Sequence, residues 1–198
     1  MCAAVLQARK SENTRQTILK AAIEEILTEG IHHATTINIA QRAGMSRGAI
    51  LHHYPTRDEL MHAALEKVLL EELESFKELT KQAKSKEITL DELLDHIWEH
   101  FSGPMFMVSL EYLTAARTNK EIKGVLMPLA RDFNNSIEEI WGTMVPDPHL
   151  REATLHSTLC MMRGMSLQSI WREDPGFSER LLLYWKEQIR KSIEGVGD

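Results

Sequence analysis

The sequence predicts an all-α fold of about nine helices, divided into a three-helix head and a larger helical body. Apolar residues recur three and four positions apart through most of the 198 residues, which is the period of an amphipathic helix. No segment shows the alternation of apolar and polar residues that is typical of a half-buried strand. Helix-breaking residues such as Gly30, Pro55 and Gly103 stand where the periodic segments stop.

The first helix is predicted over residues 11–29. Its apolar stripe consists of Ile18, Ala21, Ala22, Ile26 and Leu27. Ser11 or Asn13 is expected to cap its start, and Gly30 closes it. The basic residues Arg9, Lys10 and Arg15 near this start leave two interpretations open, a disordered terminal run or an arm that enters a DNA minor groove.

The second helix is predicted from Thr35 or Thr36 to about residue 43. Ile39 and Ala40 give it one apolar face. Gly44 ends it, because glycine accepts a left-handed backbone without a clash at Cβ.

The third helix is predicted to begin at Ser46, a good N-cap residue. Ile50 and Tyr54 lie four positions apart and can pack back onto the second helix. Pro55 ends the third helix, because the residue before a proline is pushed out of the α region. Two short helices joined by a three-residue turn with glycine predict a helix-turn-helix over residues 36–54, whose second helix enters the DNA major groove.

The remaining segments read as six longer helices. A long fourth helix begins at Asp58, and the polar segment 81–87 is predicted to be a loop. The later helices are predicted at about 89–101, 104–117, 120–144, 149–172 and 178–194. Pro104 suits the first turn of its helix, whereas Pro128 is expected to kink the seventh helix or split it in two.

The charge distribution supports two domains, a DNA-binding head over 1–57 and an acidic body over 58–198. The whole chain has a net charge of −6, yet the head holds seven Lys and Arg against four Glu. A basic head on an acidic body keeps the body away from phosphates while the head docks.

Composition narrows the class of protein further. No apolar run reaches the roughly 18 residues of a membrane span, and the N-terminus lacks a signal-peptide pattern. Two cysteines, Cys2 and Cys160, are too few for a disulfide framework or a zinc cluster. We therefore expect a cytoplasmic protein with no cofactor, no metal and no membrane partner. Cys160 lies within an apolar helix, where an inert buried thiol is favoured over a sensing thiol.

Several short motifs resemble the TetR family of bacterial transcriptional regulators. They are Thr35-x-x-x-Ile39-Ala40, Ala43-Gly-Met-Ser-Arg-Gly48, His53-Tyr54 and Arg57-Asp-Glu-Leu60. The resemblance is specific over about 50 residues of the head, and in the body it extends only to helix number and length. It implies that residues 58–198 form a ligand-binding and dimerisation domain. The protein would be a homodimer that pairs through its two C-terminal helices, binds a palindromic operator and is released when a small effector enters the body.

The same resemblance suggests which residues of the head touch DNA. The candidate DNA-binding residues are Thr36, Ser46, Arg47, Gly48, Ala49, Leu51, His52, His53 and Arg57. Arg47 and Gly48 would approach base edges, and Arg47 can pair with a guanine. Most of the others would lie near phosphates. Leu51 replaces a tyrosine that is usual in the family and could contact a thymine methyl, and Ile37 replaces a polar residue.

The body carries bulky and soft side chains that suit an apolar or amphipathic effector. The candidate ligand-binding residues are Trp98, Phe101, Phe106, Tyr112, Phe133, Trp141, Met162 and Met165. The same residues equally suit an ordinary core, in which case the protein is a constitutive dimeric DNA binder without an effector.

One segment matches the pattern of another class of protein. His96-Ile-Trp-Glu-His100 has the H-x-x-E-H form of a zinc-dependent hydrolase. On a helical wheel His96, Glu99 and His100 flank or oppose the apolar stripe of their helix, and no third protein ligand stands out. We therefore expect no enzymatic activity and keep the hydrolase as the alternative.

Overall fold

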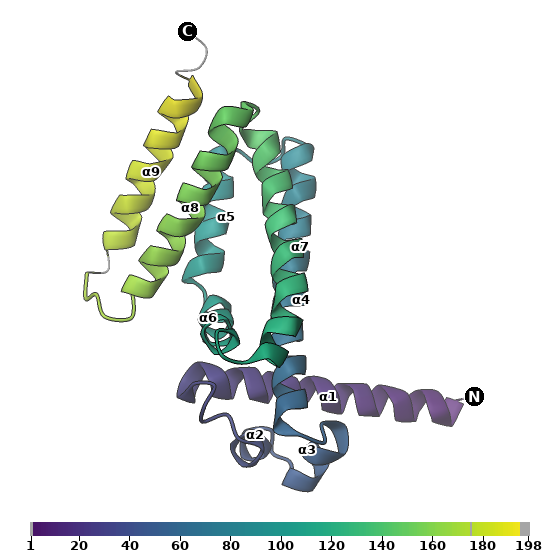
Figure 1. Ribbon diagram of the computed structural model, residues 1–198. Coiled ribbons are helices and arrows are strands. Elements are labelled where there is room, and N and C mark those ends of the chain that lie inside the picture. The colour runs from purple at the N-terminus through teal and green to yellow at the C-terminus, as the bar shows by residue number, and fades with distance from the viewer. Residues whose placement is uncertain (1, 175, 195–198) are drawn as a thin grey trace. The chain divides into compact units, whose positions relative to one another are not determined.

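The computed structural model describes residues 2–174 and 176–194. These residues form nine α-helices and contain no strand, so the predicted all-α class is confirmed (Figure 1). The helices are α1 (Cys2–Glu29), α2 (Thr36–Arg42), α3 (Arg47–His53), α4 (Arg57–Lys84), α5 (Leu90–Ser102), α6 (Pro104–Ala116), α7 (Lys120–Met144), α8 (Pro148–Gln168) and α9 (Phe177–Glu194). None of them, over the residues described, is long and apolar enough to cross a bilayer.

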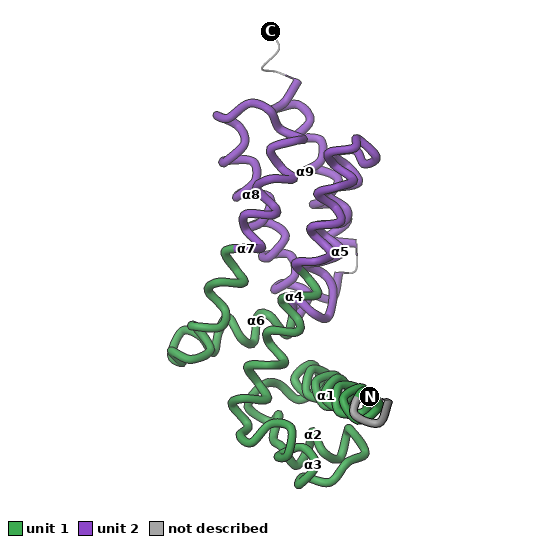
Figure 2. Tube along the Cα trace, turned by 90° about the vertical axis from the view of Figure 1, so that its right-hand side faces the viewer, with its two compact units in different colours: residues 1–72, 107–131 green, residues 73–106, 132–198 purple. Residues whose placement is uncertain are grey.

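The chain divides into two compact units (Figure 2). Unit 1 consists of residues 1–72 and 107–131, and unit 2 of residues 73–106 and 132–198. Helices α4, α6 and α7 each contribute residues to both units. The predicted boundary after residue 57 does not coincide with a boundary between these two units. It separates the chain by expected function, and it stays a prediction.

Unit 1 is built around α1, against which α2 packs, while α3 packs against α2 (Figure 1). Fully buried side chains from these helices and from α4 form its core, among them Ile18, Ile26, Ile39, Ile50, Leu60 and Leu65. Tyr112 of α6 is also fully buried, and its hydroxyl donates to the carbonyl of Met61 over 2.8 Å. A hydroxyl with such a partner is tolerated in an apolar core.

Helix α1 begins earlier than predicted. The sequence placed its start near Ser11 or Asn13, but the helix already includes residues 2–10. The apolar period could not reveal this extension, because Val5 and Leu6 are exposed and form no buried stripe. The three basic residues therefore lie on a helix and not in a disordered run, and Arg15 lies over the ring of Tyr54, 4.9 Å from its centroid. Entry of an arm into a minor groove stays a prediction.

One other predicted helix end was wrong, and of the two outcomes expected at Pro128 the split does not occur. Helix α4 continues to Lys84, so residues 81–84 are not a loop, because Ala83 extends the buried stripe and Lys81 pairs with Glu78. Helix α7 is a single helix and is not split at Pro128. Pro128 cannot bond to the carbonyl of Gly124, but both residues are exposed, so water can satisfy that carbonyl.

Unit 2 is a helical body in which α5 packs against α8, and α8 against α9 (Figure 1). A capping box formed by Thr89 and Glu92 fixes the start of α5. The core gathers Phe76, Leu93, Ile97, Phe101, Ile140, Trp141, Leu159 and Met162. The Trp141 indole is fully buried and donates to the hydroxyl of Thr154 over 3.0 Å, which anchors α7 to α8.

Candidate nucleic-acid interface

The structure confirms the local geometry predicted for the helix-turn-helix. Gly44 has a φ of +65°, which is the left-handed conformation expected at the end of α2. Ser46 caps α3, and its hydroxyl accepts from the backbone N–H of Ala49 over 3.2 Å. Ile50 and Tyr54 are buried, so α3 turns one face toward the core of unit 1.

The opposite face of α3 carries most of the predicted DNA-binding residues. Arg47, Gly48 and His52 are exposed, whereas Leu51 and His53 are half-buried. The two histidine rings meet edge to face with centroids 5.3 Å apart. Arg47 stands in the first turn of α3, where the recognition helix of this motif contacts base edges.

Gly48 leaves free space on the outer face of α3. A Cβ built on it would have the Ser46 hydroxyl oxygen, at 3.9 Å, as its nearest neighbour. The fold of unit 1 therefore does not require glycine here. A position without a side chain does let a backbone approach another molecule closely, which suits a helix that lies against DNA.

Thr36 is placed less favourably than the sequence suggested. Thr35, not Thr36, caps α2, because its hydroxyl accepts from the N–H of Asn38 over 3.2 Å. Thr36 itself is buried, whereas its neighbour Ile37 is 60% exposed. Ile37 was not among the predicted DNA-binding residues, and its exposure leaves it accessible to another molecule. A role of Thr36 at DNA stays a prediction.

Arg57 has partners within unit 1. Its guanidinium donates to the carbonyl of Ala34 over 2.9 Å and to the carbonyl of Ile31. Both carbonyls belong to the segment between α1 and α2, so Arg57 ties this segment to the start of α4. The sequence predicted a DNA phosphate as the partner of Arg57. That contact remains a prediction, because the guanidinium already donates to the two carbonyls.

Other basic residues of the head are also engaged. Arg42 pairs with Glu25 of α1 over 2.6 Å, and Lys20 lies 3.9 Å from Glu24. The charge count of the head therefore overstates the charge available to DNA. Arg47, the one Lys or Arg of α3, is exposed on the outer face of that helix.

The predicted hydrolase motif does not form a metal site. His96 faces Glu99, with 3.3 Å between Nδ1 and Oε2. His100 lies among aromatic rings, 5.0 Å from Phe76 and 5.4 Å from Phe133 between centroids. The helical wheel placed His100 beside the apolar stripe, and its half-buried ring packs there against aromatic neighbours. Within the described residues no group of three His, Cys, Asp or Glu could hold a metal ion.

His100 makes unit 2 sensitive to acid. Burial, together with the charge of Arg163, lowers the pKa of His100 from 6.5 to about 4. The folded state thus binds this proton less tightly than the unfolded state, so the His100 contribution to stability is lost as pH falls from 6.5 toward 4, by about 2 kcal/mol at pH 5. We expect His100→Phe to lose less stability than the wild type between pH 7.5 and pH 5 in urea unfolding. The exposed His156→Phe is the control, and equal acid sensitivity of all three proteins would contradict the prediction.

The predicted ligand-binding residues do not form one group. Tyr112 belongs to unit 1, whereas the other seven lie in unit 2. Phe101, Phe106, Trp141, Met162 and Met165 are buried in the core of unit 2, and Trp98 and Phe133 pack against that core. Their role at an effector stays a prediction.

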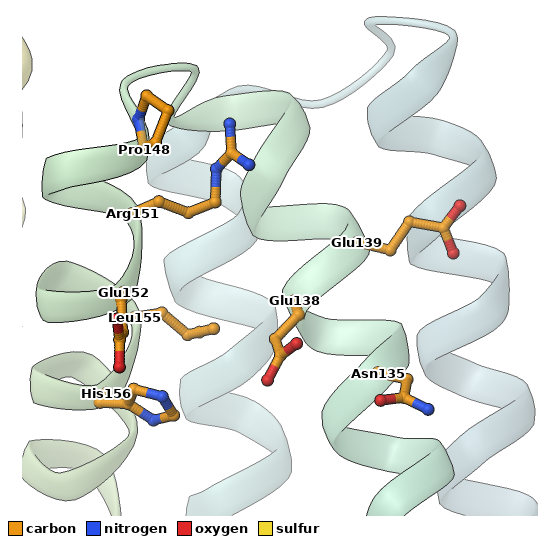
Figure 3. Close-up of a pocket in the computed structure, with 8 residues that line it drawn as sticks. All are labelled: Asn135, Glu138, Glu139, Pro148, Arg151, Glu152, Leu155 and His156. Atoms are coloured by element: carbon orange, nitrogen blue, oxygen red, sulfur yellow. The ribbon is translucent and has the colours of Figure 1, made fainter.

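A pocket of 610 Å³ lies elsewhere in unit 2, between α7 and α8 (Figure 3). Six of its eight lining residues are polar or charged, and the lining consists of Asn135, Glu138, Glu139, Pro148, Arg151, Glu152, Leu155 and His156. Arg151 donates to the carbonyls of Val145 and Pro146 and so fastens the loop between the two helices. None of the predicted ligand-binding residues lines this pocket.

Cys160 was expected to be buried, and this expectation was wrong. It is an exposed free thiol on α8. Exposed apolar side chains follow it along the chain, with Leu167 at the end of α8 and Leu183 and Tyr184 on α9. Apolar side chains of α8 therefore lie both in the core and on the outer surface of this helix.

Comparisons with known proteins agree with the geometry of the head. Residues 18–64 match the model for bacterial regulatory proteins of the tetR family. The HTH-type transcriptional regulator CymR of Pseudomonas putida is 25% identical over 179 residues, which cover 88% of each chain. The HTH-type transcriptional regulator SrpR of Pseudomonas putida is 40% identical over 58 residues, 29% of this chain and 27% of SrpR.

Solved structures share the fold. A candidate transcriptional regulator from Saccharomonospora viridis in complex with choline superimposes with a TM-score of 0.73 at 16% identity, covering 92% of this chain and 98% of that one. The helix-turn-helix geometry, the family match and the regulators that resemble almost the full chain agree with one another, and the chain belongs to the TetR family of bacterial transcriptional regulators.

Proposed function

We propose that this regulator acts as a homodimer, that it represses transcription from a palindromic operator, and that a small apolar or amphipathic effector releases it. The observation that carries the proposal is the outer face of α3, where Arg47 and Gly48 are exposed on a helix fixed by a glycine turn and a serine cap. An exposed arginine in the first turn of a recognition helix can pair with a guanine edge.

The apolar outer surface of unit 2 supports the dimer. Leu183 and Tyr184 of α9 are 60% and 57% exposed, and Ile170 and Trp171 just after α8 are exposed to a similar degree. Apolar side chains gathered on neighbouring segments mark an interaction surface in soluble proteins. Two copies that pair through α8 and α9 would cover these side chains and hold two α3 helices for two half-sites.

The effector is supported by the composition of unit 2 and by its relatives. The core between α5, α7 and α8 includes the aromatic and methionine side chains Phe101, Trp141, Met162 and Met165. One structure with the same fold is the multidrug binding protein EbrR in complex with ethidium, with a TM-score of 0.57 and 21% identity over 87% of this chain and 98% of that one. If the core is filled, as the full burial of Trp141 and Met162 favours, the protein is a constitutive dimeric DNA binder instead.

Selection from a random DNA pool tests the proposal. We expect the protein to enrich a sequence with twofold symmetry whose half-sites lie about one helical turn apart or a multiple of it. Affinity for the selected duplex should fall steeply with salt, because bound phosphates release counterions. An asymmetric selected sequence, or binding that is indifferent to salt, would contradict it.

The oligomeric state is tested in the same preparation by analytical ultracentrifugation. The wild type should sediment as a dimer, and Leu183→Arg should shift the mass toward the monomer. Leu113→Arg is the matched control, because Leu113 is a leucine of α6 that is 45% exposed and lies outside α8 and α9. A monomeric wild type, or equal effects of the two substitutions, would contradict pairing through these helices.

A further inference from the structure

Two polar side chains on one turn of α8 lie inside unit 2 without a partner of matching chemistry. Arg163 is partly buried, and within the described residues it makes no hydrogen bond and no ion pair. Its guanidinium lies over the ring of Phe101, 5.4 Å from the centroid. The hydroxyl of Ser166, a residue that is 1% exposed, has no hydrogen-bond partner.

Both groups belong to the same face of the helix. Residues three apart on a helix lie one turn above each other, so the two side chains share the face that also carries Leu159 and Met162. Helix α5 packs against α8 and brings Phe101 to this face. The rings of Phe101 and Phe106 meet edge to face at 4.9 Å, and the charge of Arg163 lowers the pKa of His100. The surroundings of Arg163 are therefore aromatic rings, including the imidazole of His100.

The energetics of these groups point to an anion. A desolvated guanidinium is unfavourable unless a negative charge compensates it, and burial lowers the pKa of Arg163. A buried hydroxyl without a partner costs about 1–3 kcal/mol. The planar fork of arginine matches a carboxylate with two parallel hydrogen bonds, and a neighbouring hydroxyl can donate a third. The charge of Arg163 also repels cations.

We infer that unit 2 binds a small aromatic carboxylate, whose carboxylate group pairs with Arg163 and accepts from Ser166 while its ring packs against Phe101. This inference rests on the proposed effector control and narrows the effector from amphipathic molecules in general to aromatic acids. It assigns Arg163 as the residue that selects the charge of the effector.

The test is calorimetry and thermal unfolding of the full chain with benzoate, 4-butylbenzoate and 2-naphthoate at millimolar concentrations. We expect the carboxylates to raise the Tm, since a ligand that binds only the folded state must do so. The matched carboxamides, which lack the charge, should bind at least roughly tenfold more weakly. A cation of similar size, benzyltrimethylammonium, should leave the Tm unchanged.

Variants separate an effector anchor from a structural arginine. Arg163→Met should weaken carboxylate binding by roughly 10- to 100-fold and leave the Tm without ligand unchanged or higher, because it removes an uncompensated charge. Ser166→Ala should weaken binding by roughly three- to tenfold. Arg190→Met is the matched control, since Arg190 is an exposed arginine of unit 2. This variant should bind the carboxylates with the affinity of the wild type.

Each outcome decides the inference independently of DNA binding. Carboxamide or cation binding as tight as carboxylate binding, unchanged affinity of Arg163→Met, or no Tm shift with any carboxylate would overturn it. If the protein gave those results but still bound the selected duplex, the proposed function as a regulator would be kept and the aromatic acid as its effector would be rejected. Carboxylate binding that requires Arg163, in a protein that selects no DNA, would support the site and defeat the proposed function.

Discussion

Replacing Gly48 with glutamate is expected to weaken binding to the selected duplex at least roughly a hundredfold, because it places bulk and negative charge where α3 meets phosphates. The fold should tolerate the change. The space beside Gly48 is open, and a glutamate in the first turn of α3 interacts favourably with the helix dipole. The Tm should therefore stay constant or rise while DNA binding is lost, as measured by gel shift and thermal unfolding.

Gly124→Glu is the matched control for this substitution. Gly124 is another exposed helical glycine of unit 1, it has nothing within 4 Å of a built Cβ, and its replacement adds the same charge. We expect Gly124→Glu to bind the duplex like the wild type. Equal losses with both variants would mean that net charge, not the surface of α3, governs binding, and our placement of the recognition helix would be wrong.

The turn and caps of the head could be predicted because each depends on neighbours in the sequence. The left-handed Gly44 and the Ser46 cap follow from local backbone chemistry, and both were confirmed. The partners of Arg57 and Arg42 could not be predicted in this way. They are carbonyls and a carboxylate from α1 and the segment after it, more than ten positions away, and only the tertiary fold brings them close.

In the body, the helical period predicted which residues lie on one face of each helix. It did not predict whether each of them faces the core, a ligand or solvent. The sequence left two interpretations of Trp141 open, a ligand contact or a core residue, and Trp141 lies in the core of unit 2. Its contact with a ligand stays a prediction. Cys160 was expected inside and is exposed, because α8 has apolar side chains on more than one face. A periodic pattern shows on which face of its own helix a side chain lies. Whether that face is buried depends on how the neighbouring helices pack.

Arg42→Met is expected to destabilise the protein by about 3 kcal/mol, because it leaves Glu25 without its cation. Glu25 is 5% exposed, and its carboxylate accepts from Nε of Arg42 over 2.6 Å. The opposite change should be milder. Glu25→Gln leaves an arginine on the surface of α2 that water can solvate, so we expect a loss of about 1 kcal/mol. Urea unfolding at neutral pH measures both values.

The double variant connects this pair to function. With both charges removed, no uncompensated carboxylate remains, so Glu25→Gln with Arg42→Met should recover most of the stability that Arg42→Met loses. Arg42 ends α2, and α3 packs on α2, so the pair with Glu25 holds the recognition helix in place through its neighbour. Affinity for the selected duplex should therefore follow stability across the three variants. A double variant that is stable yet binds DNA as poorly as Arg42→Met would instead assign Arg42 a direct contact with DNA.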